Sequence, residues 1–301
     1  MRVFITGATG FIGSHTVRAL RAANHEVAAL VYPNDSLQRL DDLSGQFDII
    51  PSDLANIGDV LELLKRWEPD ACIHLAWFAE PGKYLDSTEN IKTLISSLNL
   101  LQSLVEIGCK QIIAAGTCAE YDLNIGYLRE DSPVSPDTLY AATKSSLNLV
   151  GQQFSKNNEL IFSWARIFYL FGPQEDERRL IPSLIEALKR EESFPSTAGE
   201  QVRDYLHVED VARAFVTLLE KKAEGTYNIS SGKPITIRSL LETVGKIMRR
   251  SDLLEFGALP YRDWEPMFVC GDNRKLRSLG WAPKYDLEKG LKHTCDWWLN
   301  Q

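Results

Sequence analysis

The chain has 301 residues, of which 44% are hydrophobic and 25% are charged, and its formal net charge is −8. This length exceeds the usual size of one hydrophobic core, so one large domain or two unequal domains are expected. The acidic balance argues against nucleic acid or an anionic membrane surface as a partner. Five scattered cysteines without a C-x-x-C pair, a start without a signal peptide and the lack of a long apolar stretch predict a cytoplasmic protein with reduced thiols.

Short apolar runs alternate with longer amphipathic segments through the first half of the chain, which predicts βαβ units around a parallel sheet. Strands are expected at residues 2–6, 26–31, 47–51, 70–75, 111–115 and 160–166. Helices are expected between them, at residues 12–23, 57–67, 88–107 and 139–154. The strand at 111–115 is apolar on both faces, as is usual when helices cover both sides of a sheet.

The texture of the sequence changes after Gly172, where charge clusters and scattered glycines and prolines appear. Helices are expected there at 180–188, 208–221, 237–249 and 287–299, with a strand at 225–229 and a loop at 257–265. The fold class predicted is α/β, a Rossmann doubly wound parallel sheet with a smaller, discontinuous C-terminal substrate-binding domain. The dinucleotide-binding domain would comprise residues 1–168 and about 207–230, and the cap about 169–206 and 231–301.

A glycine-rich turn follows the first expected strand, with Gly7, Gly10 and Gly13 spaced as G-x-x-G-x-x-G. Gly7 would permit the sharp turn, Gly10 a close approach of the backbone to a pyrophosphate, and Gly13 the packing of the first helix on the strand. The amides and the dipole of that helix would then face the phosphates. A strand before the turn and a helix after it predict a dinucleotide cofactor.

The end of the second strand bears on which dinucleotide is bound. An acidic residue usually stands there to bind the adenosine ribose, but this chain has Val31 at the expected position. The missing acid removes the main repulsion against a 2′-phosphate, and Arg39 could reach back towards it. The sequence therefore favours NADP and leaves NAD open.

Tyr140 and Lys144 form a Tyr-x-x-x-Lys pair near the start of the fourth helix. A phenol titrates near pH 10, so a tyrosine that moves protons near neutral pH needs its anion stabilised. A lysine one helical turn later places an ammonium on the same face of the helix. Thr117, just past the fifth strand, could hold a substrate oxygen between its hydroxyl and the phenol. On its own this spacing is common on solvated helix faces, but downstream of the glycine turn it predicts a catalytic group.

With these motifs the chain resembles the extended short-chain dehydrogenase/reductases of the NAD-dependent epimerase/dehydratase family, which act on nucleotide sugars. The resemblance covers nearly the whole length and rests on short segments in the correct order, among them Ser52–Leu54, His74–Trp77, Gly116–Tyr121 and Arg166–Pro173. It implies Thr117, Tyr140 and Lys144 as catalytic residues. It implies cofactor binding by Gly7, Gly10, Phe11, Ile12, Gly13, Asp53, Leu54, Leu75, Ala76, Tyr140, Lys144 and Ile167.

The resemblance also implies where a sugar nucleotide binds. Arg203 begins a segment whose arginine in this family clamps the diphosphate, and Arg262 lies where a second phosphate-binding arginine is usual. Cys118 and Tyr169 are expected at the sugar, although an asparagine more often stands at the position of Tyr169. His207 is expected to be structural, as a capping or buried histidine. The helices at 88–107 and 139–154 form a homodimer in this family.

Three reactions share this scaffold: 4-epimerisation, 4,6-dehydration and reduction of a 4-keto sugar. Dehydratases of the family have Asp-Glu directly after the catalytic threonine, where this chain has Cys118 and Ala119, which argues against dehydration. We expect reduction of a 4-keto-6-deoxy nucleotide sugar at C4 with NADPH, and no metal. The alternative is an NAD-dependent nucleotide-sugar 4-epimerase. A non-catalytic cofactor-binding protein on the same fold is a third reading, which the retained Thr117, Tyr140 and Lys144 oppose.

Overall fold

The structure is a computed structural model that describes residues 1–262 and 265–301. At its centre lies a sheet of seven strands in the order β11-β7-β5-β4-β1-β2-β3, and every neighbouring pair is parallel. The strands are β1 Arg2–Thr6, β2 Glu26–Val31, β3 Asp48–Pro51, β4 Ala71–His74, β5 Gln111–Thr117, β7 Ile161–Ile167 and β11 Gly225–Ile229. The chain order reverses between β1 and β4, as in a doubly wound Rossmann sheet, so the predicted fold class is confirmed.

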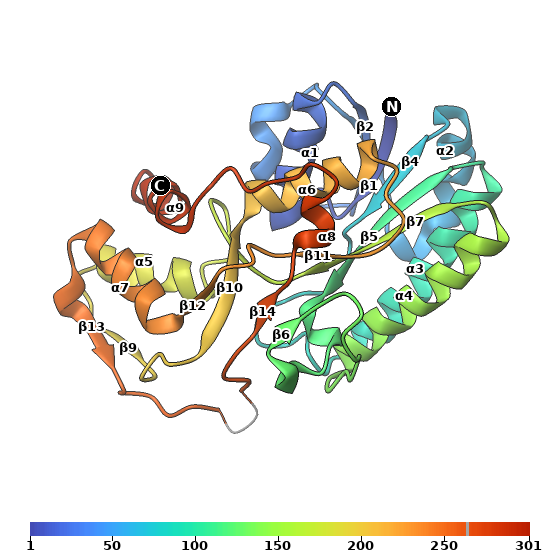
Figure 1. Cartoon of the computed structure of the whole chain (residues 1–301). Coiled ribbons are helices and arrows are strands. Elements are labelled where there is room, and N and C mark those ends of the chain that lie inside the picture. Colours follow the sequence, from blue (N-terminus) through green and yellow to red (C-terminus); the bar gives the residue numbers. More distant parts are fainter. Residues whose placement is uncertain (263–264) are drawn as a thin grey trace.

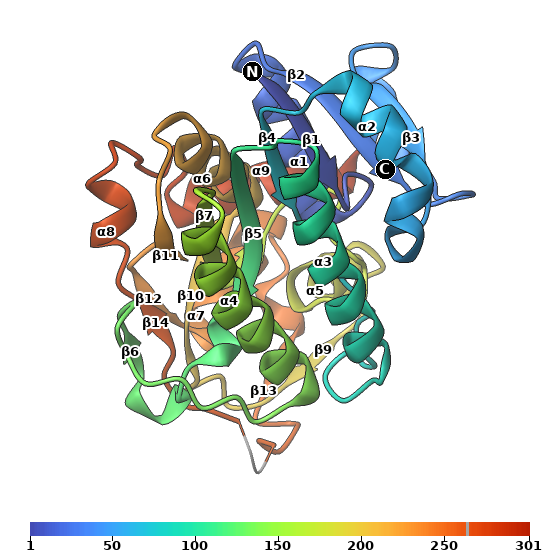
Figure 2. The same ribbon diagram turned by 90° about the vertical axis from the view of Figure 1, so that its right-hand side faces the viewer.

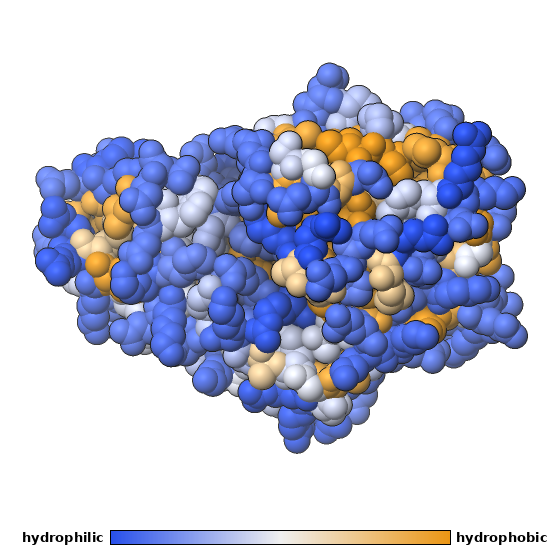
Figure 3. Space-filling view, turned by 90° about the horizontal axis from the view of Figure 1, so that it is seen from above, coloured by the Kyte–Doolittle hydropathy of each residue, from blue (hydrophilic) through white to orange (hydrophobic). Residues whose placement is uncertain are grey.

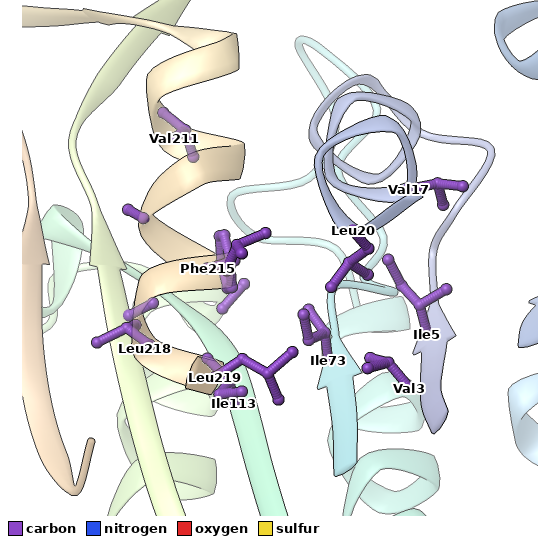
Figure 4. Close-up of a cluster of buried hydrophobic side chains, with 14 of the residues drawn as sticks. Val3, Ile5, Val17, Leu20, Ile73, Ile113, Val211, Phe215, Leu218 and Leu219 are labelled. Atoms are coloured by element: carbon purple, nitrogen blue, oxygen red, sulfur yellow. The ribbon is translucent and has the colours of Figure 1, made fainter. Parts of the chain in front are cut away.

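Helices cover both faces of this sheet. One face carries α1 (Phe11–Ala22) and α6 (Val208–Glu220), which pack their apolar residues onto β1, β4 and β5 (Figure 4). The other face carries α2 (Leu61–Trp67), α3 (Glu89–Glu106) and α4 (Leu139–Asn157). Figure 2 shows α3 and α4 side by side on the face turned towards the viewer. Each strand between two apolar helix layers is therefore buried on both faces, which explains the near-continuous hydrophobic runs.

The helix expected at 57–67 starts later than the sequence indicated. Residues Leu54–Val60 form a 3-10 helix, η2, and α2 begins only at Leu61. Gly58 and the β-branched Val60 are weak helix formers, which favours the looser first turns. Further 3-10 segments are η1 Gln38–Leu43, η3 Cys118–Glu120, η4 Leu123–Ile125 and η5 Ser251–Leu253.

A second group of elements packs on its own hydrophobic core, at the left of Figure 1. Its helices are α5 Leu180–Lys189, α7 Ile237–Met248 and α9 Leu287–Leu299. Its strands β8 (Tyr169–Phe171), β10 (Val202–His207) and β12 (Pro234–Thr236) form one small sheet, and β9 (Phe194–Ser196) pairs with β13 (Leu254–Phe256). The short pair β6 (Tyr127–Leu128) and β14 (Cys270–Gly271), with α8 (Arg274–Arg277), completes the elements. On these separate cores we propose the division into a nucleotide-binding domain and a smaller cap.

The surface seen from above is mostly hydrophilic, with apolar side chains gathered mainly over the half that holds the seven-stranded sheet (Figure 3). Within the described residues, no helix combines the length and apolar character that crossing a bilayer requires. Of the loop expected at 257–265, residues 263–264 lie outside the described part of the chain. The carboxyl ends of β1, β4, β5 and β7 all lie at one edge of the sheet, which is where ligands bind in folds of this kind.

Candidate active site

The glycine turn is closed to side chains at two of its three glycines. Gly7 has φ +72°, and a Cβ on it would lie 2.6 Å from the amide nitrogen of Ala76. A Cβ on Gly13 would lie 1.9 Å from the carbonyl oxygen of Gly7. Helix α1 follows with Gly10 at its N-cap and no acidic residue in its first turn. The turn thus brings backbone amides and a helix N-terminus together without a competing negative charge, a donor set that suits the pyrophosphate of a dinucleotide.

A buried histidine fastens the ends of two strands beneath this turn. The Nδ1 atom of His74 is 2.7 Å from the Thr6 hydroxyl, and its Nε2 atom is 2.9 Å from the Ser97 hydroxyl. Ser97 donates its own proton to the Thr93 carbonyl, so it accepts from Nε2–H and leaves Nδ1 to accept from Thr6. Burial lowers the pKa of His74 to about 3, so the ring is neutral. The sequence indicated His74 only as part of the matching segment His74–Trp77 and did not reveal this hydrogen-bond chain.

Two side chains of opposite charge, Asp35 and Arg39, contact Thr9 of the glycine turn. The Thr9 hydroxyl donates to the Asp35 carboxylate over 2.6 Å. The Arg39 guanidinium donates through Nε to the carbonyl of Gln174 at 3.0 Å, and its Nη1 is 3.4 Å from the carbonyl of Thr9. Arg39 therefore contacts the glycine turn, and its approach to a 2′-phosphate stays a prediction. Asp35 was missed because only the position of Val31 was considered for an acid.

The other predicted cofactor residues also lie at the carboxyl edge of the sheet. Asp53 follows β3, and its carboxylate accepts from the amide of Ala55 at 3.0 Å, at the start of η2 with Leu54. Leu75 and Ala76 follow β4, and the Leu75 amide donates to the carbonyl of Thr6. Ile167 ends β7 in register with Thr117 at the end of β5. These positions form a continuous row from β3 to β7.

Lys144 is held in the interior behind the end of β5. Its side chain lies in the second turn of α4, which begins at Leu139, and its Nζ donates to the carbonyl of Ala115 at 2.7 Å. The ammonium also lies over the indole of Trp77, 3.8 Å from the ring centre. Burial lowers the pKa of Lys144 to about 7, and the negative charge of Glu120 opposes that change. The ammonium is therefore close to its titration point at neutral pH.

Tyr140 precedes Lys144 by one turn and faces Thr117. Its ring meets Tyr84 and Trp77 edge to face, with centres 4.9 and 6.5 Å apart. Burial raises the pKa of the phenol well above its usual value, while a hydrogen bond with the Thr117 side chain acts in the opposite direction. The Thr117 Oγ1 atom accepts from the amide of Ala119, which leaves the hydroxyl proton free to be donated. The structure thus brings the three predicted catalytic residues to one place.

Glu120 lies directly behind Thr117 and was not singled out from the sequence. Its side chain is fully buried, and its Oε1 accepts from the amide of Thr117 at 2.8 Å. Its other contacts are with Trp164 and Arg166 of β7. The signal in the sequence was an acid three residues after a threonine, which is a capping box, but only the structure shows what lies around it.

The predicted substrate residues cluster around Arg203. Arg203 is buried and its Nη2 is 3.0 Å from the Glu265 carboxylate, while its guanidinium carbon is 5.3 Å from the centre of the Tyr169 ring. Cys118 is also buried, and burial raises the pKa of its thiol to about 12, so it stays neutral. Arg262 is exposed and stands three residues before Glu265 on the same loop. The pairing of Arg203 with Glu265 is the part that the sequence did not indicate.

His207, Glu209 and His293 lie close enough to suggest metal ligands, but the hydrogen bonds explain the cluster. The Nδ1 atom of His207 accepts from the amide of Glu209 at 3.3 Å and caps α6, which puts the ring proton on Nε2. Nε2 is 3.3 Å from Nδ1 of His293 and donates to it. A metal on Nε2 would need the proton on Nδ1, where the helix amide already donates. The structural role expected for His207 is confirmed.

The chain is similar to known proteins over nearly its whole length. The sequence profile of the NAD dependent epimerase/dehydratase family matches residues 3–230. The chain is 28% identical to the CDP-abequose synthase of Salmonella typhimurium, with 96% of each chain covered. It is 26% identical to the dTDP-6-deoxy-L-talose 4-dehydrogenase (NAD(+)) of Aggregatibacter actinomycetemcomitans, over 90% of this chain and 99% of that one.

Solved structures agree with the sequence matches. The UDP-N-acetylglucosamine 4-epimerase from Methanobrevibacter ruminantium, in complex with UDP-N-acetylmuramic acid, has a TM-score of 0.88 and 29% identity. That similarity covers 100% of this chain and 98% of the epimerase. A profile match across most of the sequence, together with the glycine turn and the Tyr140–Lys144 pair, shows that the chain belongs to the NAD-dependent epimerase/dehydratase family.

Proposed function

We propose that the protein is an NAD(P)-dependent oxidoreductase that reduces the C4 ketone of a 4-keto-6-deoxy nucleotide sugar. The observation that carries this proposal is the grouping of Thr117, Tyr140 and Lys144 at the sheet edge, with neutral Cys118 and Ala119 in place of an acid and a base. Elimination of water needs both an acid and a base, whereas delivery of one proton to a ketone oxygen needs only one donor. The 4-dehydrogenase relative supports this choice, because its named reaction in reverse is such a reduction.

Each catalytic side chain has a separate task in this proposal. The Thr117 hydroxyl donates its proton to the ketone oxygen. Its oxygen accepts from the Ala119 amide, which leaves the proton for this bond. Tyr140 delivers the proton to that oxygen, and its raised pKa keeps the phenol protonated until then. The Lys144 ammonium stabilises the phenolate that remains. The nicotinamide, when bound, supplies the hydride to C4 and leaves a positive charge that also favours the phenolate.

We propose NADP as the preferred cofactor, bound along the row from the glycine turn to Ile167. Arg39 at the carbonyl of Thr9 is the cation available to a 2′-phosphate. Asp35 at the Thr9 hydroxyl is an acid suited to ribose hydroxyls and repels a phosphate, so it limits the preference. The same residue is the observation that favours the alternative, an NAD-dependent 4-epimerase.

The diphosphate of the sugar nucleotide would bind Arg203, with Arg262 as a second cation. A buried guanidinium in an acidic protein is a strong site for an anion, because charge-assisted hydrogen bonds gain strength where water is excluded. Glu265 occupies the guanidinium as a carboxylate and would have to give way to the diphosphate. Cys118 and Tyr169 would then line the sugar, with the phenol of Tyr169 in place of the more usual asparagine amide.

We also propose a homodimer formed through α3 and α4. Ile91 and Ile95 on α3 and Leu149 and Val150 on α4 are exposed apolar residues, and Leu149 is 70% exposed. The two helices lie side by side, so these residues provide a hydrophobic surface of the kind that interfaces bury. A monomer in sedimentation velocity at micromolar concentration would contradict this proposal.

The reaction is tested with purified protein, first for retained cofactor and then for oxidation of NADPH with a 4-keto-6-deoxy nucleotide sugar. We expect cofactor-dependent turnover and a protein that gains and loses the dinucleotide during each cycle. Tightly retained NAD, with interconversion of C4 epimers in the absence of added cofactor, would overturn the reductase and establish the epimerase. Saturable NADPH binding without turnover of any nucleotide sugar would favour a non-catalytic protein.

A further inference from the structure

The buried acid Glu120 makes an unusually complete set of contacts behind the proposed catalytic threonine. Its Oε1 accepts from the Thr117 amide at 2.8 Å, and the Thr117 hydroxyl accepts from the Ala119 amide at 3.2 Å, which together form a capping box on η3. The carboxylate therefore fixes the backbone from which the Thr117 hydroxyl projects. A rotation at this backbone would move that hydroxyl away from Tyr140.

Two side chains of the neighbouring strand β7 hold Glu120 from the other side. Trp164 donates its indole proton to both carboxylate oxygens, at 2.9 and 3.0 Å, and Arg166 donates through Nε at 2.9 Å. The guanidinium of Arg166 also lies over the ring of Tyr121, 4.2 Å from its centre. The phenol of Tyr121 in turn donates to Asn228 of β11 at 2.7 Å. The Glu120 carboxylate thus links the ends of β5 and β7, and Tyr121, beneath the Arg166 guanidinium, links this group to β11.

Gly116 leaves the space that this arrangement requires. A Cβ at Gly116 would lie 2.3 Å from the indole nitrogen of Trp164 and 2.6 Å from Oε1 of Glu120. Real Cβ atoms do not approach other atoms so closely, so the carboxylate, the indole and the glycine fit only as a set. The end of β5 is therefore shaped to accommodate the Glu120 carboxylate and the Trp164 indole.

The charge of Glu120 acts on the two catalytic side chains of α4. It raises the pKa of Lys144 against the effect of burial and raises that of Tyr140 in the same direction as burial. Arg166 is paired with Glu120 itself, and the His74 ring, which interacts with Lys144, is neutral. Glu120 is therefore the negative charge that supports an ammonium at Lys144.

We propose that Glu120 is a positioning residue of the active site, which fixes the Thr117 hydroxyl and places a negative charge behind the Tyr140–Lys144 pair. It touches neither the reacting atoms nor the cofactor row, and acts through Thr117, Tyr140 and Lys144. The turnover readout rests on the proposed function, whereas the lysine readout described next does not.

The first test follows the protonation of Lys144 without any substrate. Trace acetylation with acetic anhydride at a series of pH values, read for each lysine by mass spectrometry, gives the pKa of every lysine in the folded protein. In Glu120→Gln we expect the pKa of Lys144 to be lower than in the wild-type protein measured in parallel, while the pKa values of the other lysines are unchanged. The matched control is Asp210→Asn. Asp210 is also a fully buried carboxylate, but it lies on α6, which covers the opposite face of the sheet from the helix α4 that carries Lys144. An unchanged Lys144 in Glu120→Gln would overturn the proposal.

A second variant guards against loss of folding. Glu120→Gln leaves the guanidinium of Arg166 buried without its partner, which can unfold a protein. The double variant Glu120→Gln with Arg166→Met removes both charges of the buried pair, and a fall in the pKa of Lys144 is expected here too because the same carboxylate is lost. A double variant that folds and titrates Lys144 as the wild type does would equally overturn the proposal.

The second test uses turnover. In Glu120→Gln we expect kcat to fall at least about tenfold through misplacement of Thr117, with the KM for the sugar nucleotide unchanged. The pH above which activity declines should also move down, because Lys144 loses its proton at lower pH. Equal kcat and an unmoved pH profile would contradict the proposal. If the wild type turns over no nucleotide sugar, the proposed function fails, and the lysine titration still decides the role of Glu120.

Discussion

Two arginine–carboxylate pairs of this protein have nearly the same length but different surroundings. Arg166 and Glu120 are 2.9 Å apart, with their side chains 5% and 0% exposed. Arg203 and Glu265 are 3.0 Å apart, with side chains 5% and 23% exposed. The first carboxylate is held by three further donor contacts, whereas the second comes from a surface loop. Glu120 is therefore suited to hold the backbone at Thr117 in place, whereas Glu265 is suited to be displaced from Arg203 by another anion.

The two pairs predict different effects of variants in the two parts of the candidate site. The part formed by β5, β7 and α4 is held by many hydrogen bonds, so small changes there should affect the rate of the chemical step. Changes around Arg203, Tyr169 and Glu265 should instead affect the affinity for the substrate. Three sets of variants test this division, from the largest expected effect to the smallest.

Loss of the phenol should be most damaging. Tyr140→Phe removes the proposed proton donor, so kcat should fall by at least about 10²–10⁴-fold, with cofactor affinity within a few-fold of wild type. Steady-state kinetics and fluorescence titration with NADPH measure the two effects. Tyr127→Phe serves as control, because Tyr127 is exposed on β6. Substantial turnover by a folded Tyr140→Phe protein would remove Tyr140 from the proposed role.

Changes in the Arg203–Glu265 pair should act on substrate affinity, and in opposite directions. Arg203→Ala should raise the KM for the sugar nucleotide roughly 10- to 100-fold, as expected for hydrogen bonds to a charged group. Glu265→Gln should lower that KM, because the competing carboxylate loses its charge. Both variants should leave the KM for the nicotinamide cofactor unchanged. Arg238→Ala is the control, since its guanidinium lies over Phe256 in the same part of the fold. Equal weakening for both ligands in Arg203→Ala would indicate a folding role instead.

The smallest effects are expected at the adenosine end of the cofactor, outside both pairs. Arg39→Ala should reduce the ratio of kcat/KM for NADPH to that for NADH by several-fold, and Asp35→Asn should increase it. Because Arg39 and Asp35 both contact the same turn residue, Thr9, each variant is the control for the other. A ratio that moves in the same direction in both would show that neither residue faces the 2′ position.

The sequence predicted those parts of the protein that depend on spacing along the chain. The glycine turn, the Tyr140–Lys144 pair and the alternation of strands and helices each depend on residues close together in the sequence. Over such short distances the periods of helices and strands predict which residues lie on one face. The partners of the two carboxylates could not be found that way. Glu120 lies 46 positions from Arg166, and Arg203 lies 62 from Glu265, so only the tertiary fold brings them together.

The reading of cofactor preference shows a similar limit. The sequence offered Val31 as evidence that no acid meets the ribose, but the loop after β2 returns Asp35 to the glycine turn. Short polar loops can place a side chain several positions away from where a regular strand end would put it. The identity of the residue at one position was therefore weaker evidence than the path of the loop.

The neutral histidines that fasten the fold make its stability sensitive to acid. Burial lowers the pKa of both His74 and His207 to about 3, whereas in the unfolded chain they would titrate near 6.5. Between these values the unfolded state binds protons that the folded state refuses, so acid favours unfolding by up to about 1.4 kcal/mol per pH unit for each ring. The contribution of these two rings to the free energy of unfolding, measured in denaturant, should thus be fully present above pH 6.5 and decline below it. The hydrogen bonds of His74 beneath the glycine turn would then also limit how far the pH can fall before the protein unfolds.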